Sequence, residues 1–176
     1  GRHHWNQRSK EEIEKAIECF EKSLEIDPEF SKAYSGLIDS WTMQARRQYE
    51  KKEDILPKCK EVVAKAKALG DISAEFYTSQ SEIYYIEGDV DKSLEYLKVA
   101  IDENPNYATA HHWLAIRYGE SGENKKAVEE IEKAVALDPK SPIILFAASC
   151  HNVNLGNREI QKEYLKKTME LSPGFQ

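Results

Sequence analysis

Residues 108–139 read ATAHHWLAIRYGESGENKKAVEEIEKAVALDP, and this stretch decides the fold. Its first half is rich in aromatic and small residues and is followed by Gly122. Its second half places Ile131 four residues after Ala127 and Ala134 three residues after Ile131. Spacings of four and three put side chains on one face of an α-helix. The stretch therefore predicts two helices that are separated by a turn at the glycine.

The same pattern recurs at a fixed interval along the chain. Pro105, Pro139 and Pro173 follow one another at intervals of 34 residues. The glycines that separate the helices recur at the same interval: Gly88, Gly122 and Gly156. Glycine adopts the left-handed conformation that ends a helix at low cost, and proline biases the residue before it away from helix. Repetition over residues 74–173 therefore predicts a repeat protein rather than one closed core.

The repeated unit resembles the tetratricopeptide repeat, a helix–turn–helix motif of 34 residues. Residues 108–139, with Asp138-Pro139 at the boundary, carry the resemblance most fully, and residues 74–105 match well. Residues 142–173 match more loosely, because Asn152 stands where the family usually has an aromatic side chain. The resemblance implies an all-α fold, a right-handed superhelical solenoid of antiparallel helix pairs with about four and a half repeats.

We expect a single array over residues 1–176, divided at the repeat boundaries. The first division is half a repeat, whose first helix is reduced to residues 1–6 or missing. The second carries nine extra residues within Thr42–Leu56, which we interpret as a first helix prolonged by about two turns and a charged connection. The five divisions are residues 1–30, 31–73, 74–107, 108–141 and 142–176.

Composition and charge exclude several classes of partner. The formal net charge is −6, and 32% of the residues are charged. An acidic chain is repelled by nucleic acid and by anionic membranes, so neither is expected as the main partner. The three cysteines lie far apart and predict no disulfide framework, which favours a reducing, cytoplasmic location. The longest apolar run is much shorter than a membrane span.

No catalytic motif occurs in the sequence, so we expect no enzyme activity, no cofactor and no metal site. The glycines do not form a phosphate-binding loop, and the acidic pairs lie among lysines as on a solvated helix face. His111 and His112 are adjacent, and adjacent helical side chains point about 100° apart, which prevents joint chelation. We expect His111 to pack between helices, in the position that Tyr34 and Tyr77 hold in earlier units.

The family resemblance implies a binding function. In tetratricopeptide repeat proteins the first helices line a concave groove that holds an extended peptide or a partner helix, so we expect a non-catalytic scaffold for protein interactions. The acidic positions of the second and third units and the apolar positions of the last predict a basic partner with an apolar anchor. The groove residues implied are Lys32, Ser35, Asp39, Met43, Glu75, Thr78, Glu82, Tyr85, Thr109, His112, Ile116, Ile143, Phe146, Cys150 and Val153.

One kind of peptide is not expected in this groove. Family members that bind chaperone tails hold the terminal carboxylate with lysines, asparagines and an arginine. The matching positions here carry none of these residues: Ser35, Thr78, His112, Phe146 and, one turn later, Asp39, Glu82, Ile116 and Cys150. An acidic chaperone tail would instead meet carboxylates.

Two alternatives remain open. Ile143 and Phe146 could be covered by a further repeat instead of a ligand, and Leu165 and Met169 on the last helix predict self-association through that end. The front of the chain, with residues 1–5, is also similar to repeat regions of prokaryotic multidomain regulators of winged-helix, cyclase or kinase type. That similarity implies a regulatory module of a larger transcription regulator or signalling enzyme.

Overall fold

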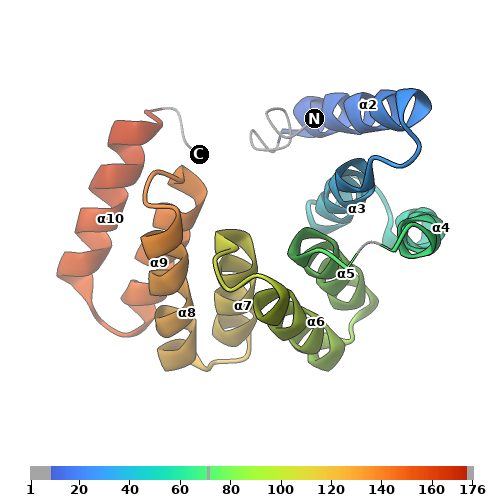
Figure 1. Cartoon of the computed structure of the whole chain (residues 1–176). Coiled ribbons are helices and arrows are strands. Elements are labelled where there is room, and N and C mark those ends of the chain that lie inside the picture. Colours follow the sequence, from blue (N-terminus) through green and yellow to red (C-terminus); the bar gives the residue numbers. More distant parts are fainter. Residues whose placement is uncertain (1–8, 71, 174–176) are drawn as a thin grey trace. The chain divides into compact units, whose positions relative to one another are not determined.

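The computed structural model describes residues 9–70 and 72–173. These residues form nine α-helices and no strand (Figure 1). The helices are α2 (Lys10–Ile26), α3 (Ser31–Arg46), α4 (Lys52–Ala68), α5 (Ala74–Glu87), α6 (Val90–Glu103), α7 (Ala108–Glu120), α8 (Asn124–Leu137), α9 (Pro142–Asn154) and α10 (Arg158–Leu171). They group into two compact units, Gly1–Glu103 with α2 to α6 and Asn104–Gln176 with α7 to α10. The all-α tetratricopeptide-like fold expected from the sequence is thus confirmed, while residues 1–6 lie outside the described residues.

The first unit is a stack in which α3 contacts α2, α4 and α5, and α5 contacts α4 and α6. Helix α2 begins at Ser9, whose hydroxyl accepts the N–H of Glu12 and so caps the helix. It buries one apolar face against α3, including Phe20, which is 7% exposed. Gly36 of α3 faces this ring: a Cβ at Gly36 would lie 2.4 Å from it. A glycine is therefore required for the close approach of the two helices.

The second unit pairs α7 with α8 and α9 with α10, and α9 also packs against α8 and α7. Ala127, Ile131 and Ala134 are completely buried, as the four–three spacing predicts. Ile131 and Ala134 belong to a cluster that also contains apolar residues of α9 and Tyr164 of α10. The buried cluster consists of Ala115, Ile131, Ala134, Ile144, Leu145, Ala148 and Tyr164.

The turns between paired helices confirm the role expected of the glycines. Gly88 has φ 96°, and Gly122 and Gly156 each have φ 78°, which is the left-handed region. At Gly88 the backbone N–H donates to the carbonyl of Tyr85, and the next N–H, from Asp89, donates to the carbonyl of Tyr84. These two bonds satisfy the last carbonyls of the helix, as in a Schellman motif.

The expected lengthening of the first helix of the second repeat by about two turns is wrong, whereas a charged connection is present at residues 47–51. Helix α3 has 16 residues against 14 in α5, so it gains less than one turn and not two. It ends in the same Schellman pattern, with Gln48 at φ 57° and the N–H of Tyr49 donating to the carbonyl of Gln44. The remaining extra residues form the turn 47–51 and lengthen α4 to 17 residues, with Pro57 inside that helix. Because these bonds satisfy the terminal carbonyls of α3, the helix stops without a glycine.

A polar network replaces the aromatic packing that Asn152 interrupts. Asn152 is 1% exposed, and its Nδ2 donates to the carbonyl of Ala148 at 3.0 Å and to Glu132 at 3.3 Å. The Tyr164 hydroxyl donates to the other oxygen of Glu132 at 2.5 Å. Burial and this hydrogen bond raise the pKa of Tyr164 above its ordinary value. The buried polar groups of this network are therefore paired, which is what their burial demands.

Replacing Gly36 with alanine tests the close approach of α2 and α3. We expect Gly36→Ala to destabilise the protein by about 1–2 kcal/mol, because displacing the Phe20 ring outweighs the gain in helix propensity. Urea unfolding followed by circular dichroism measures the change. Combining it with Phe20→Leu should cost less than the sum of the two single changes, and full additivity would contradict the contact.

Candidate functional site

Eight of the expected groove residues belong to the first unit, on α3 and α5, two helices that pack against each other. Four of them are at most 4% exposed: Ser35, Met43, Thr78 and Glu82. The other four keep accessible side-chain surface: Lys32, Asp39, Glu75 and Tyr85. A ligand at this face in the described conformation would therefore contact the second group directly.

An ion pair that the sequence reasoning missed joins the two helices. Arg46 Nη1 lies 3.0 Å from Glu82 Oε2, and the guanidinium carbon of Arg46 lies 4.8 Å from the ring centroid of Tyr85. The Glu82 side chain is only 4% exposed, so its charge needs a partner. Arg46 follows Met43 by three residues, which places both on the same face of α3. This spacing is the feature of the sequence from which the ion pair could have been predicted. The acidity expected at Glu82 is thus compensated from α3.

A second link joins the same helices at Asp39. The Ser79 hydroxyl lies 2.5 Å from Asp39 Oδ1 and 3.3 Å from the carbonyl oxygen of Ser35. Ser79 is completely enclosed, at 1% exposed, whereas Asp39 keeps accessible surface. The carboxylate is therefore oriented by a buried hydroxyl on the neighbouring helix, which fixes where its charge lies.

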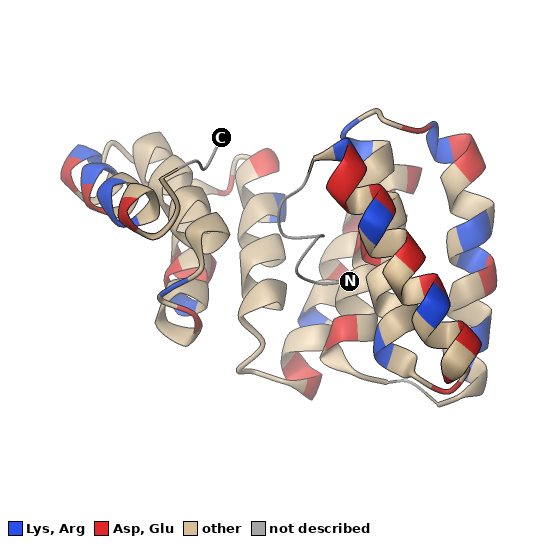
Figure 2. Cartoon of the chain, turned by 90° about the horizontal axis from the view of Figure 1, so that it is seen from above, with Lys and Arg blue, Asp and Glu red and all other residues tan. Residues whose placement is uncertain are grey.

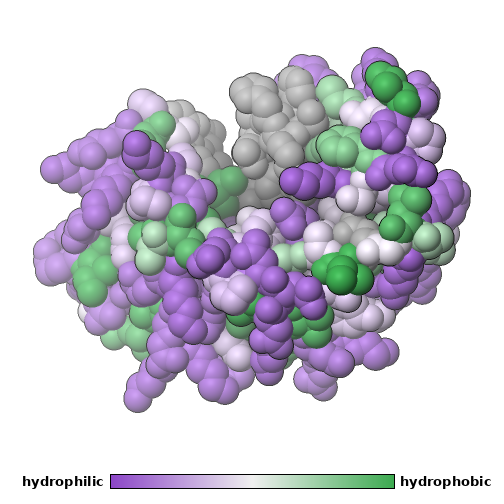
Figure 3. Space-filling view, viewed as in Figure 1, coloured by the Kyte–Doolittle hydropathy of each residue, from purple (hydrophilic) through white to green (hydrophobic). Residues whose placement is uncertain are grey.

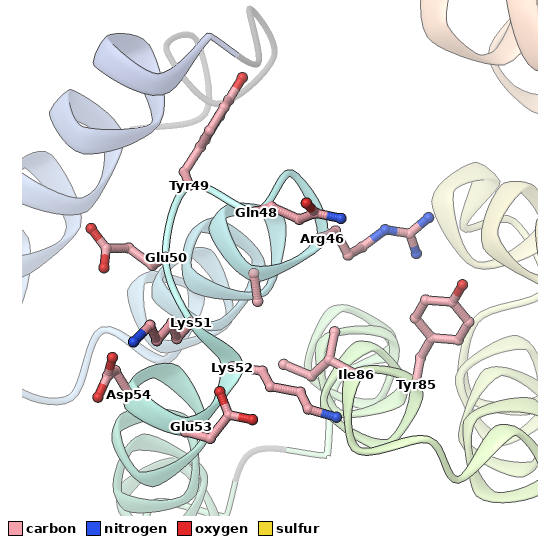
Figure 4. Close-up of a pocket in the computed structure, with 11 residues that line it drawn as sticks. Arg46, Gln48, Tyr49, Glu50, Lys51, Lys52, Glu53, Asp54, Tyr85 and Ile86 are labelled. Carbon is pink, nitrogen blue, oxygen red and sulfur yellow. The ribbon is translucent and has the colours of Figure 1, made fainter.

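An open hollow of about 780 Å³ lies beside this ion pair, where the turn 47–51 connects α3 to α4. Figure 4 shows Lys52 beside Ile86 and the ring of Tyr49 directed away from both. The side chains around it carry both signs of charge, which suits binding of a polar segment. The hollow is lined by Ala45, Arg46, Gln48, Tyr49, Glu50, Lys51, Lys52, Glu53, Asp54, Tyr85 and Ile86. No histidine or cysteine is among these described lining residues.

The other seven expected groove residues belong to the second unit. On α7, His112 is 4% exposed and stacks on Trp113 with ring centroids 5.4 Å apart, and Thr109 and Ile116 are partly buried. On α9, Ile143 is partly buried. The remaining three are exposed and four and three residues apart, so they form one stripe along the helix, called here the α9 stripe: Phe146, Cys150 and Val153. Phe146 is 43% exposed and Val153 is 42% exposed.

His111 packs between helices, in the position that Tyr34 occupies in the first unit. His111 Nε2 lies 3.0 Å from the carbonyl oxygen of Pro105, and the Tyr34 hydroxyl donates to the carbonyl of Pro28 at 2.8 Å. Both side chains thus hold the boundary proline that lies six residues earlier. His111 Nδ1 lies 2.7 Å from Glu130 Oε2. Burial by itself raises the pKa of Glu130, but hydrogen bonds from Lys133 and His111 outweigh it and lower that pKa.

Charge is distributed unevenly between the helices. Helix α9 carries no Lys, Arg, Asp or Glu, whereas α10 and α2 alternate basic and acidic side chains along their length (Figure 2). Within the described part of the chain, no three His, Cys, Asp or Glu side chains gather as a metal site would require. No helix there is long and apolar enough to cross a membrane.

Two models of the tetratricopeptide repeat match the sequence, one over residues 84–147 and the other over residues 7–30. The chain belongs to the tetratricopeptide repeat family. Comparison with the curated proteins gave no match.

Solved tetratricopeptide repeat structures share the fold at low sequence identity. TTC0263, a thermophilic member from Thermus thermophilus, gives a TM-score of 0.74 at 22% identity, over 98% of this chain and 90% of that chain. YrrB, described as having an unusual peptide-binding site, gives 0.57 at 20% identity, over 93% and 80%. The first repeat domain of Spaghetti (RPAP3), bound to the HSP90 peptide SRMEEVD, gives 0.56 at 19% identity, over 60% and 84%.

Removing Arg46 tests the ion pair that joins α3 and α5. We expect Arg46→Met to destabilise the protein by about 3 kcal/mol, because it leaves the Glu82 carboxylate buried without this partner. Urea unfolding measures the loss, and Arg46→Met combined with Glu82→Leu should recover most of it. The control is Lys65→Met, which breaks an exposed pair with Glu61 and should cost less than about 1 kcal/mol. Equal losses for the two methionine variants would contradict the assignment.

Proposed function

We propose that this tetratricopeptide repeat protein is a non-catalytic scaffold that binds a segment of another protein through the outward faces of its first helices. The observation that carries the proposal is the α9 stripe, where Phe146 and Val153 are more than two-fifths exposed on a helix without charged residues. Exposed aromatic and aliphatic side chains in one stripe are typical of an interaction surface.

Two of the structural neighbours support this class of function. YrrB has a peptide-binding site, and the RPAP3 domain binds a peptide of HSP90, as their descriptions state. Their identities to this chain are 20% and 19%, so the shared property that supports the proposal is the fold. The neighbours support a peptide as the kind of ligand. The sequence of that peptide is inferred from the residues of this chain instead.

The side chains that a ligand would meet suggest its chemistry. On the first unit, Asp39 and Glu75 keep accessible surface, Asp39 accepts a hydrogen bond from Ser79, and Glu82 is paired with Arg46. On the second unit, the α9 stripe offers apolar surface. We therefore propose that basic residues of a partner protein bind at the first unit and that an apolar side chain of a partner protein binds at α9. An acidic chaperone tail lacks this complementarity with Asp39 and Glu75, so the proposal does not extend to the HSP90 peptide in this position.

A cytoplasmic location fits the proposal and rests on the cysteines. None of the three is in a disulfide among the described residues: Cys19, Cys59 and Cys150. Burial raises the pKa of the Cys59 thiol to about 12, so it is protonated and unreactive at neutral pH. Such unpaired cysteines are typical of a reducing compartment.

Peptide selection tests the scaffold proposal without a known partner. Random linear peptides displayed on phage and selected on the full chain should enrich sequences with Lys or Arg and one large apolar residue. We expect Phe146→Ala to bind the enriched peptide about tenfold more weakly in a fluorescence titration, a loss of about 1.4 kcal/mol. The matched control is Ile26→Ala, because Ile26 on α2 is 86% exposed, the highest value for a large apolar side chain among the residues that the structure describes.

The outcome is read from affinity together with folding. Both variants should keep the helical circular-dichroism spectrum of the parent, since both side chains are more than two-fifths exposed. Unchanged affinity in Phe146→Ala, or an equal loss in Ile26→Ala, would contradict binding at the α9 stripe.

We also propose that a second copy of the chain covers part of α10. Leu165 is partly buried, but Met169 is 67% exposed and Leu171 is 46% exposed. In Figure 3, apolar residues form separate green patches within a mainly hydrophilic surface. Large apolar side chains that are exposed together on one helix are typical of an interaction surface.

Light scattering over a concentration series tests this self-association. We expect the apparent mass to rise above that of one chain at high concentration, and Met169→Lys to reduce the rise because a lysine cannot be buried unpaired. Glu170→Gln is the control, since it changes the net charge by the same amount one position away. A monomer at every concentration would overturn the proposal.

A further inference from the structure

Helix α4 packs against the helix that follows it differently from α8. Its register is fixed by Cys59 and Ala66, which correspond to Ala127 and Ala134 of α8. Each pair is seven residues apart, and all four side chains are completely buried. With this register, every other position of α4 can be compared with its counterpart in α8.

The apolar residues that close the next interface are replaced in α4. In α8, Ile131 is completely buried and Val135 packs against the same cluster, which includes residues of α9. The matching residues of α4 are Val63, which is only partly buried, and Lys67, which is exposed. A lysine keeps its ammonium group in water and cannot fill an apolar interface with it. The α4–α5 interface is therefore left open where the corresponding α8–α9 interface is filled.

A pocket of about 120 Å³ lies between α4 and α5 as a result. Val63, Ile83 and Tyr84 give it apolar walls, Lys60 and Lys67 line it from α4, and Gln80 and Glu87 line it from α5. A water molecule occupies about 30 Å³ of liquid. The pocket therefore has room for a few waters or for the end of one short side chain.

Gln80 gives the pocket its polarity. It lines the pocket, is 2% exposed, and its Nε2 has no hydrogen-bond acceptor among the residues that the structure describes. The residue 34 positions later, in α7, is Leu114, which is buried without any polar group to satisfy. A buried N–H without an acceptor costs free energy that an apolar residue would avoid. An oxygen atom entering the pocket would remove that cost.

The charges around the pocket indicate which oxygen-containing group it would bind. Lys60 Nζ lies 2.7 Å from Glu87 Oε1, so these two lining charges compensate each other and the positive charge of Lys67 remains on the lining. A carboxylate accepts hydrogen bonds without donating any, which matches an amide N–H in a pocket that the Lys67 ammonium group also lines. We propose that this pocket, called here the α4–α5 pocket, binds the side-chain carboxylate of a glutamate or aspartate from a protein partner. The apolar walls contact its methylene groups.

This pocket is separate from the surface assigned to the peptide above. At about 100° per residue, Gln80 and Tyr84 lie on the side of α5 opposite to Thr78 and Glu82. The inference therefore does not rest on the proposed function of the first-helix faces, and each can fail without the other.

A titration observed by NMR tests the pocket directly. The probe is N-acetyl-glutamate N′-methylamide added to the full ¹⁵N-labelled chain, and the control probe is the glutamine analogue, which has the same shape without the charge. We expect saturable shifts of the Gln80 side-chain amide and of the Val63 and Ile83 backbone amides with the acid alone. Absence of those shifts, or equal shifts with both probes, would overturn the proposal.

Variants separate binding from folding. Gln80→Leu should abolish the saturable shifts at Val63 and Ile83 while raising the melting temperature, because it removes an unpaired buried donor. Lys67→Gln should weaken binding about tenfold, whereas Lys65→Gln, an equal change of charge on an exposed part of α4, should leave it unchanged, as should Phe146→Ala. A lower melting temperature for Gln80→Leu, or equal effects of the two lysine changes, would contradict a carboxylate site at Gln80.

Discussion

The structure depends on small side chains at two fixed positions of its second helices. These positions hold Cys59 and Ala66 in α4, Ser93 and Ala100 in α6, and Ala127 and Ala134 in α8, and all six are completely buried. A side chain of this size lets the axis of a second helix approach the first closely, so the hairpin buries apolar surface without a deep core. The same two positions set the register in which every outward-facing residue is presented.

That register explains which residues are available for binding. Each first helix packs one face against the second helix of its own hairpin and another face against a neighbouring helix. Ser35, Thr78 and His112 are therefore buried. The side chains left accessible are fewer than a helical projection suggests, and in the second unit they concentrate in the α9 stripe. Charged residues make up 32% of the chain and lie largely on the second helices. Residues of both signs on those helices keep the outer surface soluble.

The parts of the fold that follow the repeat were predictable from the sequence, because a 34-residue interval encodes both helices and the turn between them. Gly88, Gly122 and Gly156 take the left-handed conformation expected of them. The end of α3 was not predictable by the same reasoning, since Gln48 adopts that conformation without being glycine. The hydrogen bonds that end α3 are donated by backbone N–H groups to the carbonyls of Ala45 and Gln44, so the amino-acid types do not reveal them.

The site was less predictable than the fold, because pairing across helices decides it. From the sequence, Glu82 is expected to be an acidic group available to a ligand. In the structure it is paired with Arg46, 3.0 Å away, on a helix that ends within the inserted stretch. The α4–α5 pocket likewise needs the three-dimensional register, since Lys60 and Lys67 look like ordinary solvated lysines in the sequence. Which charged residues form ion pairs and which line a pocket depends on the distances between the helices, and the sequence alone does not give those distances.

The central claim, that the outward faces of the first helices bind a protein segment, can be tested most directly by photo-crosslinking. Cys150 is exposed in the α9 stripe, and Cys59 is buried and protonated, so a thiol-reactive photo-crosslinker on a Cys19→Ser variant labels Cys150 selectively. The account predicts that a peptide selected on this chain crosslinks from Cys150 and does not crosslink when the label is moved to position 26. Crosslinking from position 26 alone, or from neither position while the peptide is bound, would contradict it.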